Sequence, residues 1–234
     1  MRPSHAVAEH VSESIAHAKP HLRGWLHLGI LPLTLAGGLA LVLVSPDART
    51  RAGSAVFTLS ALLLFGVSAA YHCGNWSPRT WFVLRRLDHC NIFLLVAGSC
   101  TAYALLLLDA HDSLVMLTIV WSTALLGVAA RFVWPHAPRW LSPPLYIAAG
   151  WGALLFVPGL IHGASRLGDE VGATTLVLLA AGGALYVTGA VVYFFQRPDP
   201  WPRWFGFHEV FHAFTVLAFV SHYAGISVAT LSMR

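Results

Sequence analysis

The sequence at residues 25–44 reads WLHLGILPLTLAGGLALVLV, twenty residues without a single Asp, Glu, Lys or Arg. A helix that crosses the apolar part of a bilayer needs roughly 20 such residues. Comparable runs follow at about 54–73, 88–108, 113–133, 142–162, 171–194 and 208–229. The segments between them are short and carry Pro, Gly, Asp or Asn, which is typical of loops. The pattern predicts an all-α integral membrane protein built as a bundle of seven transmembrane helices.

The composition supports a membrane protein and excludes both a soluble domain and a nucleic-acid-binding protein. Only 10% of the 234 residues are charged and 57% are hydrophobic, with a mean hydropathy of +0.68. A soluble domain carries about 25% charged residues, so this chain lacks the polar surface to cover itself in water. Basic residues are scattered singly through the connecting segments instead of clustering on one face, which excludes a nucleic-acid partner. Three cysteines, at or within spans, indicate no disulfide framework.

The chain reads as one domain with polar ends. We expect a polar segment at residues 1–23, a seven-transmembrane domain at 24–230 and a tail at 231–234. The polar segment has no apolar core and no small-residue cleavage site, which argues against a removable signal peptide. The first span is therefore expected to direct insertion.

Loop charges predict the orientation of the bundle. Ten Lys and Arg residues fall on the side of the amino terminus and four on the other side, and cytoplasmic loops carry the excess of positive charge. We therefore expect the amino terminus in the cytoplasm and the carboxy terminus outside. The first side holds Arg2, Lys19, Arg23, Arg79, Arg85, Arg86, Arg131, Arg139, Arg197 and Arg203, and the second holds Arg49, Arg51, Arg166 and Arg234.

Polar and ionisable residues at the ends of three spans are the candidate functional residues. Ser68 and His72 close the second span, Asp88 opens the third, and His208 and His212 open the seventh. Ionisable side chains inside a membrane are costly and mark functional sites. The second span runs towards the cytoplasm, and the third and seventh start there. The predicted topology therefore brings His72, Asp88, His208 and His212 to one depth at the cytoplasmic end, with Ser68 one turn from His72.

Three imidazoles and a carboxylate at one depth favour a zinc site. His208 and His212 are four residues apart and share one helix face, as in helical zinc motifs, and His72 supplies the third nitrogen. Three histidine ligands and a water form an open, catalytic type of site, in which zinc lowers the pKa of the water towards ~7. Asp88 then either binds zinc directly or orients and deprotonates the water. Ser68 or Tyr71 is a candidate to stabilise negative charge.

The remaining polar residues have weaker interpretations. Glu209 points away from the face shared by His208 and His212, and we expect it at the membrane interface. His89 and His222 receive no role from the sequence. An alternative in which His72 and one of the two paired histidines hold a haem iron stays open from the residue types.

The ordered set of motifs resembles the hemolysin III family, the bacterial branch of the progestin and adipoQ receptor group. The matching pieces are SxxxH at residues 68–72, RLDH at 86–89, GFHEVFH at 206–212 and SHY at 221–223, on a seven-span frame from about Gly24 to Ser227. The resemblance implies zinc held by His72, His208 and His212, with Asp88 contacting a bound water. It also implies a cytoplasmic amino terminus, in agreement with the loop charges.

The related alkaline ceramidases suggest hydrolysis of a lipid amide. The resemblance thus implies a zinc-dependent hydrolase of a lipid acyl amide or ester, with Asp88 and Ser68 as catalytic residues. We expect it in the bacterial inner membrane as a multi-pass protein, with a membrane lipid as substrate or ligand. Two alternatives stay open, a receptor-like sensor of membrane state with structural zinc and a pore-like protein suggested by the word hemolysin.

Overall fold

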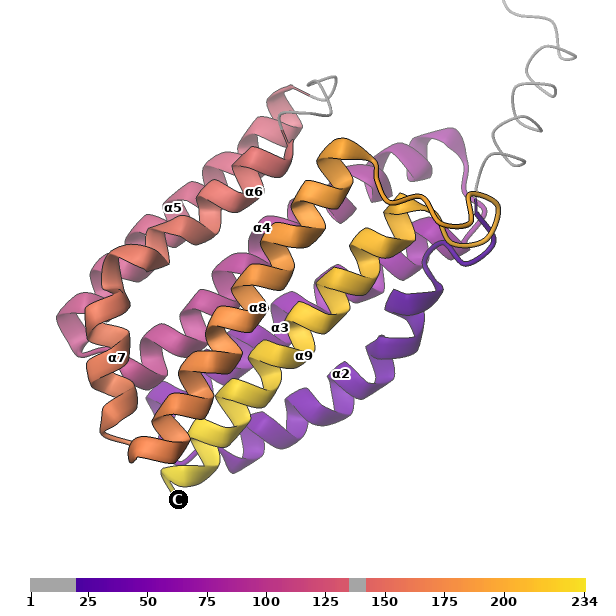
Figure 1. The fold of residues 1–234 in the computed structure, drawn as a ribbon. Helices are drawn as coiled ribbons and strands as arrows, with labels where there is room; N and C mark the ends of the chain where they lie inside the picture. Colours follow the sequence, from indigo (N-terminus) through magenta and orange to yellow (C-terminus); the bar gives the residue numbers. More distant parts are fainter. Residues whose placement is uncertain (1–19, 135–141) are drawn as a thin grey trace, which may run out of the picture.

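The structure, a computed structural model, describes residues 20–134 and 142–234, which form a bundle of helices joined by short connections (Figure 1). Within these ranges seven helical segments are long and apolar enough to cross a membrane. This confirms the predicted all-α membrane fold. Most of the predicted polar segment at residues 1–23, and most of the loop before the fifth span, lie outside the described residues.

The helices extend by a few residues beyond most of the apolar runs from which they were predicted. The elements are α2 (Trp25–Val44), α3 (Ala48–Cys73), α4 (Pro78–Leu107), α5 (Ala110–Val133), α6 (Ser142–Trp151), η2 (Gly152–Phe156), α7 (Val157–Ser165), α8 (Asp169–Phe195) and α9 (Phe207–Ser232). Side chains cap several starts. Asp47, for example, accepts hydrogen bonds from the backbone N–H groups of Arg49 and Thr50 before α3. The hydrogen bond from the Thr50 amide is the main reason that the pKa of Asp47 lies below its ordinary value.

The fifth span differs from the single helix predicted for residues 142–162. It consists of α6, a 3₁₀ turn and α7 in succession. Pro158 lies in the first turn of α7. Its missing N–H leaves no hydrogen bond unmade at this position, but the proline does not allow the preceding helix to continue through it. The tighter 3₁₀ turn absorbs this interruption.

The third span is the centre of the bundle. In the most apolar stretch of α4, 72% of residues are buried, against 17% for the fifth span and 22% for α2. Sequential helices pack against each other most extensively, in particular α8 against α9 and α3 against α4, and α9 also contacts α2. Phe57, Phe65, Phe93, Tyr103 and Ile226 lie in the core, each almost completely buried.

Three separate segments meet at one end of the bundle, which we call the histidine end. It comprises residues 20–27, 72–89 and 196–212 and lies opposite the carboxy terminus (Figure 1). The chain before α2 is held there by backbone hydrogen bonds, from His21 N to Arg203 O at 3.1 Å and from Leu22 N to Trp204 O at 3.2 Å. That this end faces the cytoplasm stays a prediction.

Candidate metal centre

The last turns of α3 and the first turns of α4 carry three of the predicted site residues to the histidine end. Ser68 and His72 are buried one turn apart near the end of α3. The chain then turns, and the Ser77 hydroxyl accepts a hydrogen bond from Thr80 N at 3.3 Å where α4 begins. Asp88 follows on α4, also buried.

The first turns of α9 supply the other two histidines. Helix α9 starts at Phe207, and Glu209 accepts a hydrogen bond from Gly206 N at 2.8 Å, which satisfies one of the backbone donors at the helix start. His208 and His212 are one helical turn apart, and their ring centroids lie 4.5 Å from each other. The local structure therefore places both rings side by side.

The three imidazoles converge on one point. His72 Nε2 and His208 Nε2 are 3.3 Å apart, and the His72 ring centroid lies 5.0 Å from that of His208 and 5.1 Å from that of His212. One nitrogen from each ring lies within 4.8 Å of the others, so the group can hold a metal ion. Desolvated neutral imidazoles are common metal ligands.

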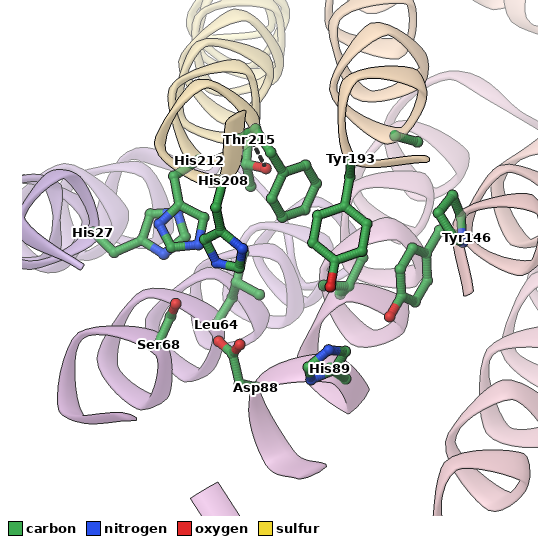
Figure 2. Close-up of a pocket in the computed structure, with 14 residues that line it drawn as sticks. His27, Leu64, Ser68, Asp88, His89, Tyr146, Tyr193, His208, His212 and Thr215 are labelled. Atoms are coloured by element: carbon green, nitrogen blue, oxygen red, sulfur yellow. Dashed lines mark hydrogen bonds between the residues drawn. The ribbon is translucent and has the colours of Figure 1, made fainter. Parts of the chain in front are cut away.

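Asp88 and Ser68 border the same space. The Asp88 Oδ2 atom is 3.7 Å from His72 Nε2, too far for a direct hydrogen bond. Both residues line a small pocket of about 20 Å³ together with His208 and His212, and Figure 2 shows their side chains facing it. A space of this size holds one water molecule.

This combination of a histidine group, a buried aspartate and a seven-span frame can be compared with known proteins. The family described as Haemolysin-III related matches residues 15–223 of the chain. The chain belongs to this family. The match includes every residue of the candidate site.

Curated relatives place this haemolysin-III related protein in a wider group. It is 29% identical over 161 residues to the Hemolysin-3 homolog of Bacillus subtilis (strain 168), covering 69% of each chain. It is 26% identical over 194 residues to Hemolysin-3 of Bacillus cereus, covering 82% of each. It is also 26% identical over 222 residues to the adiponectin receptor protein of Drosophila melanogaster, covering 87% of this chain and 49% of the receptor. The predicted membership of the hemolysin III and adipoQ receptor group is confirmed.

A fourth imidazole, which the sequence reasoning missed, lies against the group in this haemolysin-III related chain. His27 on α2 is 2% exposed, and its ring stacks on that of His212 at 4.0 Å with an angle of 16°. Among the described residues neither His27 nitrogen has a hydrogen-bond partner. The signal was available, because His27 is an ionisable residue near the start of a span that begins at the histidine end.

His89 also lines the pocket, on the side away from His27 (Figure 2). Its Nδ1 lies 2.6 Å from Arg85 O. A carbonyl only accepts hydrogen bonds, so Nδ1 is the protonated nitrogen of this ring. In the neutral ring Nε2 is then left as an acceptor. Tyr71, the alternative to Ser68 in the sequence reasoning, packs its ring against His72 at 4.4 Å and does not line this pocket.

Glu209, for which the sequence predicted a place at the membrane interface, is enclosed by the protein. Its side chain is 1% exposed, and Oε1 accepts a hydrogen bond from Arg23 Nε at 2.8 Å. The chain before α2 folds across the start of α9 and covers the carboxylate, a tertiary contact that helix periodicity does not reveal. Since Oε2 caps α9 at the same time, one carboxylate fixes both the segment before His27 and the turn that carries His208.

We expect Glu209→Ala to lower the free energy of unfolding by about 3 kcal/mol, the lower end of the cost of breaking a buried ion pair. The lower end applies because 22% of the Arg23 side chain is exposed, so water can partly solvate its guanidinium once the carboxylate is lost. Glu209→Gln retains an acceptor for the Gly206 amide and should lose less, about 1–2 kcal/mol. Unfolding in mixed detergent micelles measures both values. As a matched control, the exposed Glu170 replaced by Ala should change stability by less than about 0.5 kcal/mol; an equal effect of the two alanines would contradict the structural role of Glu209.

Proposed function

We propose that the histidine group binds zinc through His72, His208 and His212. The observation that carries the proposal is the convergence of three imidazole nitrogens within 4.8 Å beside a buried carboxylate. Two nitrogens bound to a tetrahedral zinc at 2.0–2.1 Å lie roughly 3.3 Å apart, and His72 Nε2 and His208 Nε2 have this separation. The donor set also suits zinc, which accepts imidazole nitrogen readily.

We propose further that the protein is a hydrolase of a lipid acyl amide or ester, acting from the cytoplasmic leaflet of the bacterial inner membrane. A zinc ion at three histidines supplies Lewis-acid polarisation of a carbonyl and activation of a water. Asp88, 3.7 Å from His72 Nε2 and outside the group of three, is placed to accept a proton from a water in the pocket. Ser68, buried one turn before His72 on α3, can donate to the oxygen on which negative charge develops.

A second, much larger cavity supports a lipid as the substrate. It has a volume of about 560 Å³ and an almost entirely apolar lining, and it shares part of its wall with the site pocket. The shared residues are Leu64, Ile92, Tyr146, Ala190, Phe211 and Thr215. An acyl chain can therefore lie in the cavity while its carbonyl reaches the histidines. An apolar lining does not favour the pore-like alternative, because ion pathways are lined by polar groups.

The metal content and the turnover of acylated lipids test this proposal directly. Purified full-length protein should contain close to one zinc per chain by elemental analysis, and treatment with a chelator should remove both the zinc and the hydrolysis of a fluorogenic N-acyl or O-acyl lipid. Readdition of zinc should restore turnover. Protein that contains no zinc and binds none would overturn the metal assignment; zinc-loaded protein that cleaves neither an amide nor an ester would overturn the hydrolase assignment.

A second candidate function, a receptor-like regulator with a closed, structural zinc site, depends on whether His27 binds the ion. A fourth protein ligand excludes the water that catalysis needs, and His27 is the imidazole at hand. In the present arrangement its ring is nearly parallel to that of His212 at 4.0 Å. Imidazole lone pairs lie in the ring plane, so two stacked rings do not point at one ion. This geometry favours the open site.

We therefore expect His27→Phe to retain zinc, because phenylalanine preserves the stack on His212 without any ligand atom. His27→Ala removes the support of the His212 ring, and loss of such outer contacts lowers metal affinity roughly tenfold. Competition with a chromophoric chelator measures both affinities. If His27→Phe lowers the zinc affinity as much as His27→Ala or more, His27 is a ligand and the regulator with structural zinc becomes the better proposal.

A further inference from the structure

A second group of hydrogen-bonding side chains lies in the large cavity, away from the histidine end. His222 follows His212 by ten residues on α9, which places it about 15 Å further along the helix. It is 4% exposed and lines the cavity of about 560 Å³. Tyr103 of α4 and Tyr186 of α8 line the same cavity.

The His222 ring is held between these two tyrosines. It stacks on Tyr186 with centroids 5.5 Å apart and an angle of 22°, and meets Tyr103 edge-on at 5.5 Å. The Tyr103 hydroxyl donates a hydrogen bond to His222 O at 3.3 Å. We call His222, Tyr103 and Tyr186 the outer polar seat.

Gly182 of α8 completes the enclosure. A Cβ atom at this position would come within 2.6 Å of His222 Nε2 and Cδ2, so only glycine leaves room for the ring in its present place. An aromatic pair and a glycine from two other helices thus fix one histidine against the cavity. Such fixed polar groups in an otherwise apolar lining are typical of ligand sites.

The outer polar seat has unused hydrogen-bonding capacity. Among the described residues His222 Nδ1 is buried without a hydrogen-bond partner. The buried Tyr186 hydroxyl makes no hydrogen bond of good geometry and interacts only with the Ser99 side chain. An unsatisfied buried polar group is destabilising and is rare in folded proteins. A partner in the cavity would remove this penalty. Because the described residues that line the cavity include no Lys, Arg, Asp or Glu, that partner is expected to be neutral.

We propose that the outer polar seat binds a hydroxyl group carried part-way along the hydrocarbon chain of a lipid. A neutral hydroxyl both donates and accepts, so it can satisfy an imidazole nitrogen and a phenol together. The orientation of the chain, with its carbonyl at the histidine end and the hydroxyl about 15 Å away along α9, rests on the proposed function. The presence of the seat itself does not depend on a bound metal.

Binding of two esters to full-length protein treated with a chelator tests the proposal apart from any turnover. Methyl 12-hydroxystearate and methyl stearate differ only in a hydroxyl two thirds of the way along the chain. In competition against radiolabelled methyl 12-hydroxystearate, the wild type should prefer the hydroxylated ester about fivefold to tenfold, the contribution of one net hydrogen bond. Equal binding of the two esters by the wild type would overturn the proposal, since water alone would then satisfy these groups.

Two variants and one further ligand make the result specific. His222→Phe and Tyr186→Phe keep the aromatic packing and remove hydrogen-bonding atoms, so at least one should reduce the preference to within about twofold while plain ester binds as before. A preference unchanged in both variants would overturn the assignment to the outer polar seat.

Methyl 2-hydroxystearate tests the placement of the hydroxyl and needs no variant. Its hydroxyl lies next to the ester, and the wild type should not favour it over methyl stearate. If it does so as strongly as the 12-hydroxy ester, the seat is not the hydroxyl site.

Discussion

Replacing His208 with alanine is expected to remove zinc from the protein and to abolish hydrolysis of an acylated lipid. His208 Nε2 lies 3.3 Å from His72 Nε2 and belongs to the three-histidine group, so its loss leaves two imidazoles on different helices. The affinity should fall by more than the roughly 100-fold that loss of an outer-shell partner costs. Because the metal contributes several kcal/mol to the transition state, the rate should fall about a thousandfold or more.

Elemental analysis and turnover on the same preparation measure both effects. The matched control is His111→Ala, which removes an exposed histidine from the start of α5 and should leave zinc content and rate at wild-type values. His208→Ala protein should still elute as a folded species, since the ring packs against side chains such as Tyr193 and Phe211 and alanine keeps the backbone hydrogen bonds of α9. Full zinc content in the variant would show that the ligand assignment is wrong.

The fold followed from the sequence because one physical signal dominates it. A run of roughly 20 apolar residues is costly anywhere except in a bilayer, and in this chain short loops separate the runs cleanly. The length and hydropathy of an apolar run do not reveal an interruption of the helix within it. Pro158 and Gly152 lie inside an apolar run, and only the helix hydrogen bonds distinguish a straight helix from the sequence of α6, 3₁₀ turn and α7 that forms there.

The candidate site was predictable where topology and local spacing decide it. His208 and His212 share a face of α9 by periodicity alone, and alternation of the spans brings His72 and Asp88 to the same end. His27 was not predicted although the same rule applies to it, because it belongs to none of the motifs at residues 68–72, 86–89, 206–212 and 221–223. What it does there depends on a 4.0 Å ring stack, which no spacing rule predicts.

Glu209 makes a contact that the sequence did not reveal. Its helix position is correct, yet its surroundings come from the chain before α2, which pairs Arg23 with it across 186 residues of sequence. A glutamate three residues after Gly206 is a signal for a helix start, so the capping role of Glu209 could be predicted from the sequence. The buried ion pair was not, since its cost and gain depend on tertiary burial alone.

The role of Asp88 decides between an open and a closed metal site. Its Oδ2 lies 3.7 Å from His72 Nε2, and its carboxylate does not belong to the group of nitrogens that lie within 4.8 Å of one another. Its position outside that group favours a carboxylate that acts through a water over one that binds the ion. A general base within hydrogen-bond reach of a water in the pocket contributes typically 10²–10⁴-fold to a rate.

Asp88→Asn is therefore expected to retain zinc and to lower the rate of lipid hydrolysis by about 10²–10⁴-fold. Asparagine has nearly the same shape, although its NH₂ donates where a carboxylate oxygen accepts. Its amide does not accept a proton from water, so the loss should fall on kcat while KM stays close to the wild-type value. Zinc analysis and steady-state kinetics on the purified variant measure the two parts. Asp88→Glu restores a base on a longer side chain and should recover part of the rate. Loss of zinc in Asp88→Asn would make Asp88 a direct ligand and the site a closed one, whereas full activity would remove it from the mechanism.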